Sequence, residues 1–207
     1  MKKDSLPLGL YIHIPFCEQK CLYCDFYSLP DAQTRMDEYT RALTAHLIEV
    51  APRAASHSVD TVYFGGGTPS YLGVKPLKTL LSAIDKHYAL QRDAEITLEA
   101  NPDSAADWRA LRALRRAGIN RISIGMQSAV DEELRAVGRI HTFEQVRDAV
   151  EAARKAKIKN LSLDLIYGLP GQTTESFARS LRAAVDLQPE HISCYGLKLE
   201  GGTPLYD

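Results

Sequence analysis

Apolar and polar residues alternate in six short stretches of this chain, and between them apolar residues recur every three to four positions. The alternating stretches are residues 8–14, 59–64, 95–100, 121–126, 161–166 and 191–199. A period of two is typical of β-strands, and a period near 3.6 of amphipathic helices. The helical pattern covers residues 32–51, 75–88, 105–117, 143–156 and 175–187. This order predicts an α/β fold with a parallel sheet curled into a partial (β/α)6 barrel.

Residues at the helix ends agree with these boundaries. Thr142 and Thr174 stand immediately before two of the helical patterns and are predicted N-caps. Gly118 follows an arginine-rich last turn and is predicted to lie just beyond the end of its helix.

Each predicted strand carries aliphatic residues on one face and polar or small residues on the other. The aliphatic face must meet the helices, so the second face lines the interior of the barrel. Polar residues on that second face include Tyr11, Glu99, Gln127 and Asp164. A closed eight-stranded barrel fills its interior with aliphatic side chains. A polar interior therefore predicts a wider barrel with a polar ligand near the carboxyl ends of the strands.

The composition is that of an ordinary soluble globular protein. The 207 residues are 45% hydrophobic and 25% charged, with a formal net charge of −1. This balance gives no electrostatic case for binding nucleic acid or an acidic membrane surface. No apolar run reaches the roughly 18 residues that a membrane-spanning helix requires.

The first 16 residues resemble a strand more than a signal peptide. Lys2 and Lys3 precede a short apolar stretch, but there is no small-residue cleavage site, and Tyr11 and His13 interrupt the apolar residues. Three of the four cysteines are clustered, unlike a secreted disulfide framework. We expect a cytoplasmic protein in a reducing, oxygen-poor setting.

The cysteine cluster carries the strongest chemical signal. Cys17, Cys21 and Cys24 form a Cx3Cx2C pattern, CEQKCLYC, directly after the first predicted strand. Three thiolates can hold a [4Fe-4S] cluster and leave one iron open to a small molecule. A structural zinc site is the alternative, but it requires a fourth ligand close by, and the next twenty residues contain no cysteine or histidine. Cys194 lies far away and is predicted to be a small buried hydrophobic residue.

The same spacing also fits one face of a helix, because positions i, i+4 and i+7 share a face. Pro15 and the strand-like segment before it argue against a regular helix at this point.

Residues 11–26, YIHIPFCEQKCLYCDF, resemble the signature of the radical S-adenosylmethionine (SAM) proteins. The resemblance is to the branch related to oxygen-independent coproporphyrinogen III dehydrogenase. It implies a TIM-like partial barrel in which the methionine end of SAM chelates the open iron. It also implies that an electron, from a donor such as flavodoxin or ferredoxin, cleaves the sulfonium to give a 5′-deoxyadenosyl radical.

The segment GGGTP, residues 65–69, follows the second predicted strand. Glycines without a Cβ let a ligand approach the backbone closely, although an isolated GGG is as often a flexible turn. By resemblance, Gly66, Gly67 and Thr68 meet the amino-acid end of SAM, through backbone N–H and C=O groups.

The resemblance assigns SAM contacts to further residues. Taken alone, Glu99 would be a helix cap or a surface charge, and Arg139 a surface arginine. In the resembled family, a carboxylate at Glu99 meets the ribose or amino group, and an arginine at Arg139 meets the SAM carboxylate with its planar donor fork. The remaining assignments are Gln127 to a ribose hydroxyl or the carboxylate, Asp164 to the ribose, and Tyr23 to the adenine. Tyr11 is expected on the same rim because it lies on the interior face of the first strand.

Two branches of the resembled family differ in function. One oxidatively decarboxylates coproporphyrinogen III and carries an additional cysteine, Cx3Cx2CxC, and an N-terminal extension. Here that position is Phe26, and the first strand begins near residue 8. Both departures favour the other branch, a haem chaperone that binds SAM and haem and transfers haem to acceptor proteins. The dehydrogenase stays as the alternative, and a zinc-stabilised barrel without redox chemistry as a third.

The last predicted strand runs almost to residue 207, whereas members of the resembled family are considerably longer. We expect residues 1–207 to form the radical-SAM core domain, without the family's C-terminal domain. His13 and His141 are candidate haem ligands. A histidine in either place is more often packed or hydrogen-bonded than bound to haem.

Overall fold

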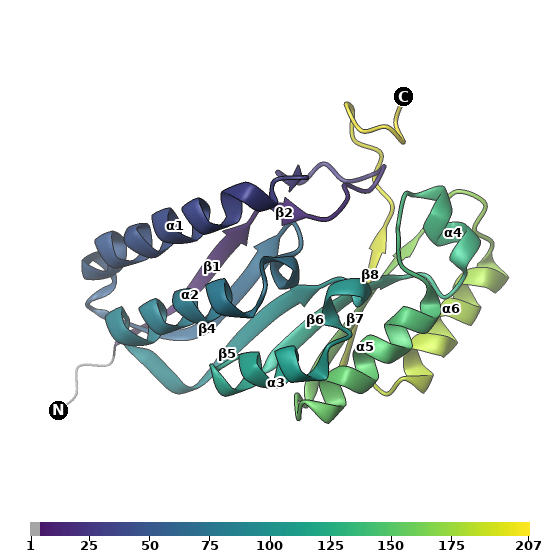
Figure 1. Cartoon of the computed structure of the whole chain (residues 1–207). Coiled ribbons are helices and arrows are strands. Elements are labelled where there is room, and N and C mark those ends of the chain that lie inside the picture. Colours follow the sequence, from purple (N-terminus) through teal and green to yellow (C-terminus); the bar gives the residue numbers. More distant parts are fainter. Residues whose placement is uncertain (1–4) are drawn as a thin grey trace.

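The computed structural model describes residues 5–207, so Lys2 and Lys3 lie outside the described residues. Six parallel strands form one sheet, in the order β1–β4–β5–β6–β7–β8 (Figure 1). Within the described residues β1 does not pair with β8, so the barrel is open on one side, and the predicted partial barrel is confirmed. The strands are β1 (Leu6–Ile14), β4 (His57–Gly66), β5 (Leu90–Ala100), β6 (Arg121–Gln127), β7 (Asn160–Tyr167) and β8 (His191–Gly196).

The helices cover one face of this sheet (Figure 1). Leu98, Ile122 and Leu163 are fully buried on that face, as the alternation predicted. Burial of such side chains contributes about 1.5–3 kcal/mol each. None of the described helices is long and apolar enough to cross a membrane. They are α1 (Met36–Val50), α2 (Val74–His87), α3 (Trp108–Arg116), α4 (Asp131–Ala136), α5 (Phe143–Lys155) and α6 (Thr174–Asp186).

The helix caps confirm two predictions and correct one. Thr142 caps α5 in a capping box with Gln145, and Gly118 follows α3 with a φ of 124°. The predicted cap at Thr174 is wrong, because Thr174 is the first residue of α6 and Thr173 accepts the hydrogen bond from the Ser176 N–H. A cap must precede its partner by three residues, and only Thr173 meets that spacing.

Several short elements were missed. The 32–51 helix is divided into α1 and two 3-10 turns, η1 (Gln33–Arg35) and η2 (Ala51–Ala54), and two further 3-10 turns follow β4 and β5. Helix α4 and the paired two-residue strands β2 (Phe16–Cys17) and β3 (Leu29–Pro30) are too short to show a period.

Cys194 is exposed, which contradicts its predicted burial. It pairs in register with the fully buried Leu165, so it does face the helix side of the sheet. β8 is the edge strand, and no further helix follows it within the described residues. Burial on that face requires a covering helix, and strand parity cannot report whether one is present.

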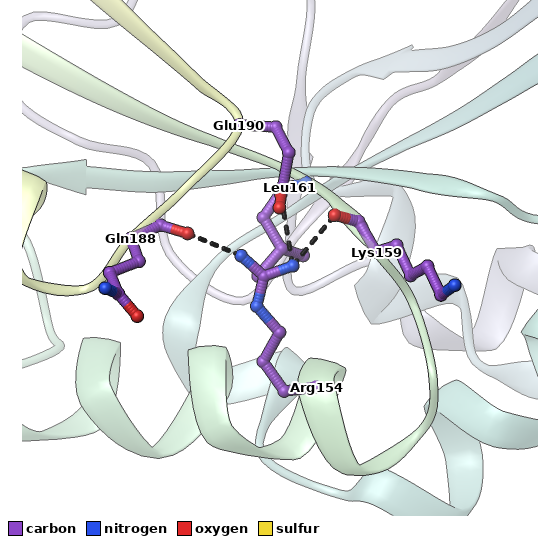
Figure 2. Close-up of polar contacts among 5 residues, drawn as sticks. All are labelled: Arg154, Lys159, Leu161, Gln188 and Glu190. Atoms are coloured by element: carbon purple, nitrogen blue, oxygen red, sulfur yellow. Dashed lines mark hydrogen bonds and ion pairs between the residues drawn. The ribbon is translucent and has the colours of Figure 1, made fainter.

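Arg154, in the last turn of α5, braces the amino-terminal edge of the sheet (Figure 2). Its guanidinium donates to the carbonyl oxygens of Lys159 (2.8 Å) and Gln188 (2.6 Å), just before β7 and β8. It also lies 3.1 Å from Oε2 of Glu190, which accepts from the Leu161 N–H (2.8 Å). One side chain therefore fixes the segments that lead into two neighbouring strands, β7 and β8.

Replacing Arg154 by Met is expected to lower the free energy of unfolding by about 1–2 kcal/mol, because two carbonyls lose a charged donor at a half-exposed site. Chemical denaturation measures the change. Arg135→Met is the control, since its ion pair with Glu132 is exposed and should contribute less than about 0.5 kcal/mol. Equal stability of the two variants would contradict the bracing role.

Candidate functional site

The carboxyl ends of the strands and the cysteine loop, residues 17–28, enclose a cavity of about 500 Å³. All the predicted site residues except Tyr11 line it, although they come from segments far apart in the sequence. The C-terminal segment closes one side: Leu197 and Lys198 line the cavity, and the Leu205 N–H donates to the Leu22 carbonyl (3.0 Å). Figure 1 shows this segment beside the cysteine loop near β2.

The cysteine loop is not a helix. Cys17 ends strand β2 and is buried, while Cys21 and Cys24 lie half-buried in a turn closed by the Cys24 N–H and the Cys21 carbonyl (3.1 Å). The alternative of a helical stripe is therefore wrong. All three thiols are free and face the same cavity.

The three thiols do not converge on one point. Within residues 5–207, no three His, Cys, Asp or Glu side chains converge as one metal ion requires. A [4Fe-4S] cluster binds each thiolate through a different iron, so its cysteines stand apart around a shared space. Of the cysteines in the described residues, Cys17, Cys21 and Cys24 line the cavity; they would hold such a cluster and leave one iron without a cysteine ligand.

The pKa values of two of the three thiols are raised overall, although nearby donors oppose the rise. Burial raises the pKa of Cys17 and Cys21, and the Arg139 guanidinium acts in the opposite direction on both. The Thr68 hydroxyl also donates to Cys17 Sγ, at 3.6 Å. A bound metal would therefore compensate the cost of burying the thiolate charges, which the nearby donors compensate only in part.

The glycine segment packs directly against the start of the cysteine loop. A Cβ on Gly67 would lie 2.8 Å from the Phe16 carbonyl oxygen and 3.0 Å from Cys17 Sγ, so only glycine fits there. The Gly67 N–H donates to the Ile14 carbonyl and the Thr68 N–H to the Phe16 carbonyl, both at 2.8 Å. These hydrogen bonds fix the position of the segment between β4 and the cysteine loop.

The Gly66 N–H is also engaged, with Oε2 of Glu99 at 3.2 Å. These three N–H groups are therefore paired within the protein, and the expected contact of this segment with a ligand would fall to its carbonyl groups. The Gly67 carbonyl accepts no hydrogen bond from the described residues, and it remains as the backbone group for an ammonium.

Two carboxylates, from β5 and β7, also line the cavity. Glu99 Oε1 accepts from the Tyr63 hydroxyl (2.7 Å), and Asp164 Oδ2 accepts from the Ser123 hydroxyl (2.9 Å). Burial raises the pKa of Glu99, and the Asp164 charge adds to the rise. Each carboxylate has acceptor capacity left for a ligand hydroxyl or ammonium.

Arg139 lies in the loop after α4, as expected, and is part of a polar chain that reaches the cysteines. It donates to the Tyr23 hydroxyl (2.7 Å) and to Oδ1 of Asn101 (2.8 Å). The Asn101 amide donates to the Thr68 hydroxyl (3.2 Å), which in turn donates to Cys17. Burial raises the pKa of Tyr23 to about 12, so its hydroxyl stays protonated.

Gln127 is buried at the end of β6 with an unusual backbone. Its φ is 61°, a conformation that costs a residue other than glycine roughly 1–3 kcal/mol. Its Oε1 is buried and has no hydrogen-bond partner among the described residues, although the residue lines the cavity. Buried polar atoms are nearly always paired, so this oxygen is a candidate ligand contact.

Tyr11 shares the interior face but lies outside the cavity wall. Its side chain is 60% exposed and stacks on Tyr63, with ring centroids 6.1 Å apart. Tyr63, not Tyr11, contacts Glu99. Three further site residues were not predicted: Tyr63, Asn101 and Ser123. Strand parity was the signal available for Tyr63 and Ser123, and for Asn101 it was the position two residues after Glu99.

Comparison with known proteins identifies similar chains. Residues 11–184 match the radical SAM superfamily. The chain is 42% identical over 198 residues to a protein of Escherichia coli (strain K12) named heme chaperone HemW, covering 95% of this chain and 52% of the relative. The protein of the same name from Bacillus subtilis (strain 168) is 39% identical over 198 residues, with 95% and 52% covered. The chain thus spans about half the length of these relatives.

Solved structures give the same fold. Coproporphyrinogen III oxidase (HemN) from Escherichia coli, described as a radical SAM enzyme, superposes with a TM-score of 0.87 at 34% identity, covering 94% of this chain and 45% of that one. The methyltransferase TsrM from Kitasatospora setae superposes with a TM-score of 0.68 at 18% identity, covering 95% and 38%. The second likeness concerns the fold alone.

Proposed function

We propose that this chain, which belongs to the radical SAM superfamily, is the SAM-binding part of a haem chaperone. It would hold a [4Fe-4S] cluster through Cys17, Cys21 and Cys24 and bind SAM in the adjoining cavity. The whole protein would bind haem and transfer it to an acceptor protein.

The similarity to proteins named haem chaperones carries this proposal, since identities near 40% extend over about 95% of the chain. Phe26 adds a local argument. It lines the cavity with its side chain 69% exposed, at the position where the resembled dehydrogenase branch has another cysteine. A phenyl ring there cannot ligate a metal.

Different lining residues would bind different parts of SAM. Arg139 presents N–H groups to a carboxylate, and the Gly67 carbonyl an acceptor to an ammonium. Asp164 and Glu99 accept hydrogen bonds from hydroxyls, which fits a ribose. A bound cluster supplies an open iron and an electron, received from a donor protein such as flavodoxin or ferredoxin.

Oxygen-independent coproporphyrinogen III dehydrogenase is the second candidate. The match to HemN at 34% identity supports it, because the superposition covers 94% of this chain. The two candidates differ in what happens to the porphyrin: a chaperone binds and releases it unchanged, and a dehydrogenase decarboxylates it.

The whole protein, reconstituted without oxygen, distinguishes the candidates. We expect haem titration to give a saturable change in haem absorbance, and incubation with SAM, reductant and coproporphyrinogen III to give no product. Cys17→Ala is the control that separates haem binding from cluster-dependent chemistry. SAM-dependent formation of protoporphyrinogen, lost in Cys17→Ala, would overturn the chaperone proposal in favour of the dehydrogenase.

A further inference from the structure

Strand β6 ends in a γ-turn centred on Gln127. The Ser128 N–H donates to the Met126 carbonyl (2.8 Å), across a residue whose φ is 61°. γ-turns with a positive central φ are rare and strained. The pairing of β6 with β7 also shifts register between Ile124 and Gln127, so the turn leaves the regular ladder. Without support, the backbone here would relax to an extended conformation.

His141 supports the turn from the helix side. Its side chain is 3% exposed, and Nε2 lies 3.2 Å from the same Met126 carbonyl oxygen. Because a carbonyl only accepts, Nε2 carries the proton. Burial, together with the Arg139 charge, lowers the pKa of His141 to about 4, so the ring is neutral at pH 7. The histidine thus donates a hydrogen bond from a fixed, buried position.

A second brace holds the residue after the turn. The Ser128 hydroxyl donates to Glu133 Oε2 (2.6 Å) and accepts from the Val130 N–H (3.0 Å). Glu133, 4% exposed, also accepts from Ser176 and from the Gln172 amide (3.0 Å). The carboxylate therefore connects the end of β6 to the turn that follows β7.

Gly125, which has no Cβ, leaves room for the Gln127 side chain beside the turn. A Cβ on Gly125 would lie 2.9 Å from Gln127 Nε2. The Gln127 side chain, 7% exposed, therefore lies against bare backbone in the cavity wall, with Oε1 unpaired.

We propose that His141 is a positioning residue that, through the Met126 carbonyl, keeps Gln127 in its γ-turn so that Oε1 accepts a hydrogen bond from a hydroxyl or ammonium of bound SAM. This inference depends on the proposed binding of SAM in the cavity. Neither the half-buried His13 nor any other described histidine has a hydrogen bond to this turn.

A double-mutant cycle tests this coupling in the reconstituted protein, with SAM affinity measured by calorimetry and cluster content by iron analysis. Gln127→Ala should weaken SAM binding about 3–10-fold, the effect of one lost neutral hydrogen bond. His141→Ala should weaken it by a similar factor, and the double variant no more than Gln127→Ala. His141→Gln, whose amide nitrogen replaces Nε2, should restore most of the affinity.

Two further variants keep the outcome interpretable. Tyr88→Phe removes another buried hydrogen bond to a backbone carbonyl, that of Leu47, away from the cavity, and should leave SAM affinity unchanged. If His141→Ala does not fold, His141→Leu, which fills the space without a donor, replaces it. Additive losses, or unchanged SAM affinity in His141→Ala or in its substitute His141→Leu, would overturn the inference alone. No SAM binding by the wild-type protein would overturn the proposed function as well.

Discussion

Replacing Cys17, Cys21 or Cys24 by Ala is expected to abolish the iron–sulfur cluster, while Cys194→Ala leaves it intact. The three thiols face one cavity, and no other cysteine among residues 5–207 lines it, so none of them has a substitute. Wild-type protein reconstituted without oxygen should contain about four irons and four sulfides per chain. Iron and sulfide analysis with the visible absorption spectrum measures this loss.

Cys194→Ala is a stringent control because that thiol is exposed and therefore accessible to adventitious iron. Stoichiometric zinc without iron–sulfur absorption in the wild-type protein would rule out the cluster and restore the zinc-stabilised barrel. Retention of a full cluster in any of the three loop variants would show that the ligand assignment is wrong.

Asp164→Ala is expected to weaken SAM binding by about 1.5–3 kcal/mol, or roughly 10- to 150-fold. Its carboxylate is held by Ser123 and lines the cavity, and alanine leaves a ligand hydroxyl without its charged acceptor. Calorimetry on the reconstituted protein measures the affinity.

Asp93→Ala is the matched control, because Asp93 is exposed near the start of β5, away from the cavity. Iron content should be unchanged in both variants, since neither removes a cysteine. Unchanged SAM affinity in Asp164→Ala would show that SAM does not bind on this wall.

Strand alternation was sufficient to place Glu99 and Asp164 on the cavity wall. Side-chain parity is local to a strand, so it survives any arrangement of the other elements. The parallel order of the sheet followed for the same reason, since helices between the strands return the chain to the same edge.

Features that depend on contacts between distant segments could not be predicted. The N–H groups of Gly67 and Thr68 looked free, but β1 and β2 supply their acceptors. Tyr11 has the parity of the cavity wall, yet Tyr63 on the neighbouring strand contacts Glu99 in its place. The γ-turn at Gln127 depends on His141, fourteen residues further along the chain, and no local pattern marks it.

Electron paramagnetic resonance of the reduced, reconstituted protein, with and without SAM, tests most directly whether the cluster and SAM share this cavity. We expect SAM to change the cluster signal, because its amino-acid end would bind the iron that the three cysteines leave open. Asp164→Ala should require a higher SAM concentration for the same change. A wild-type cluster signal that saturating SAM leaves unaltered would contradict the account.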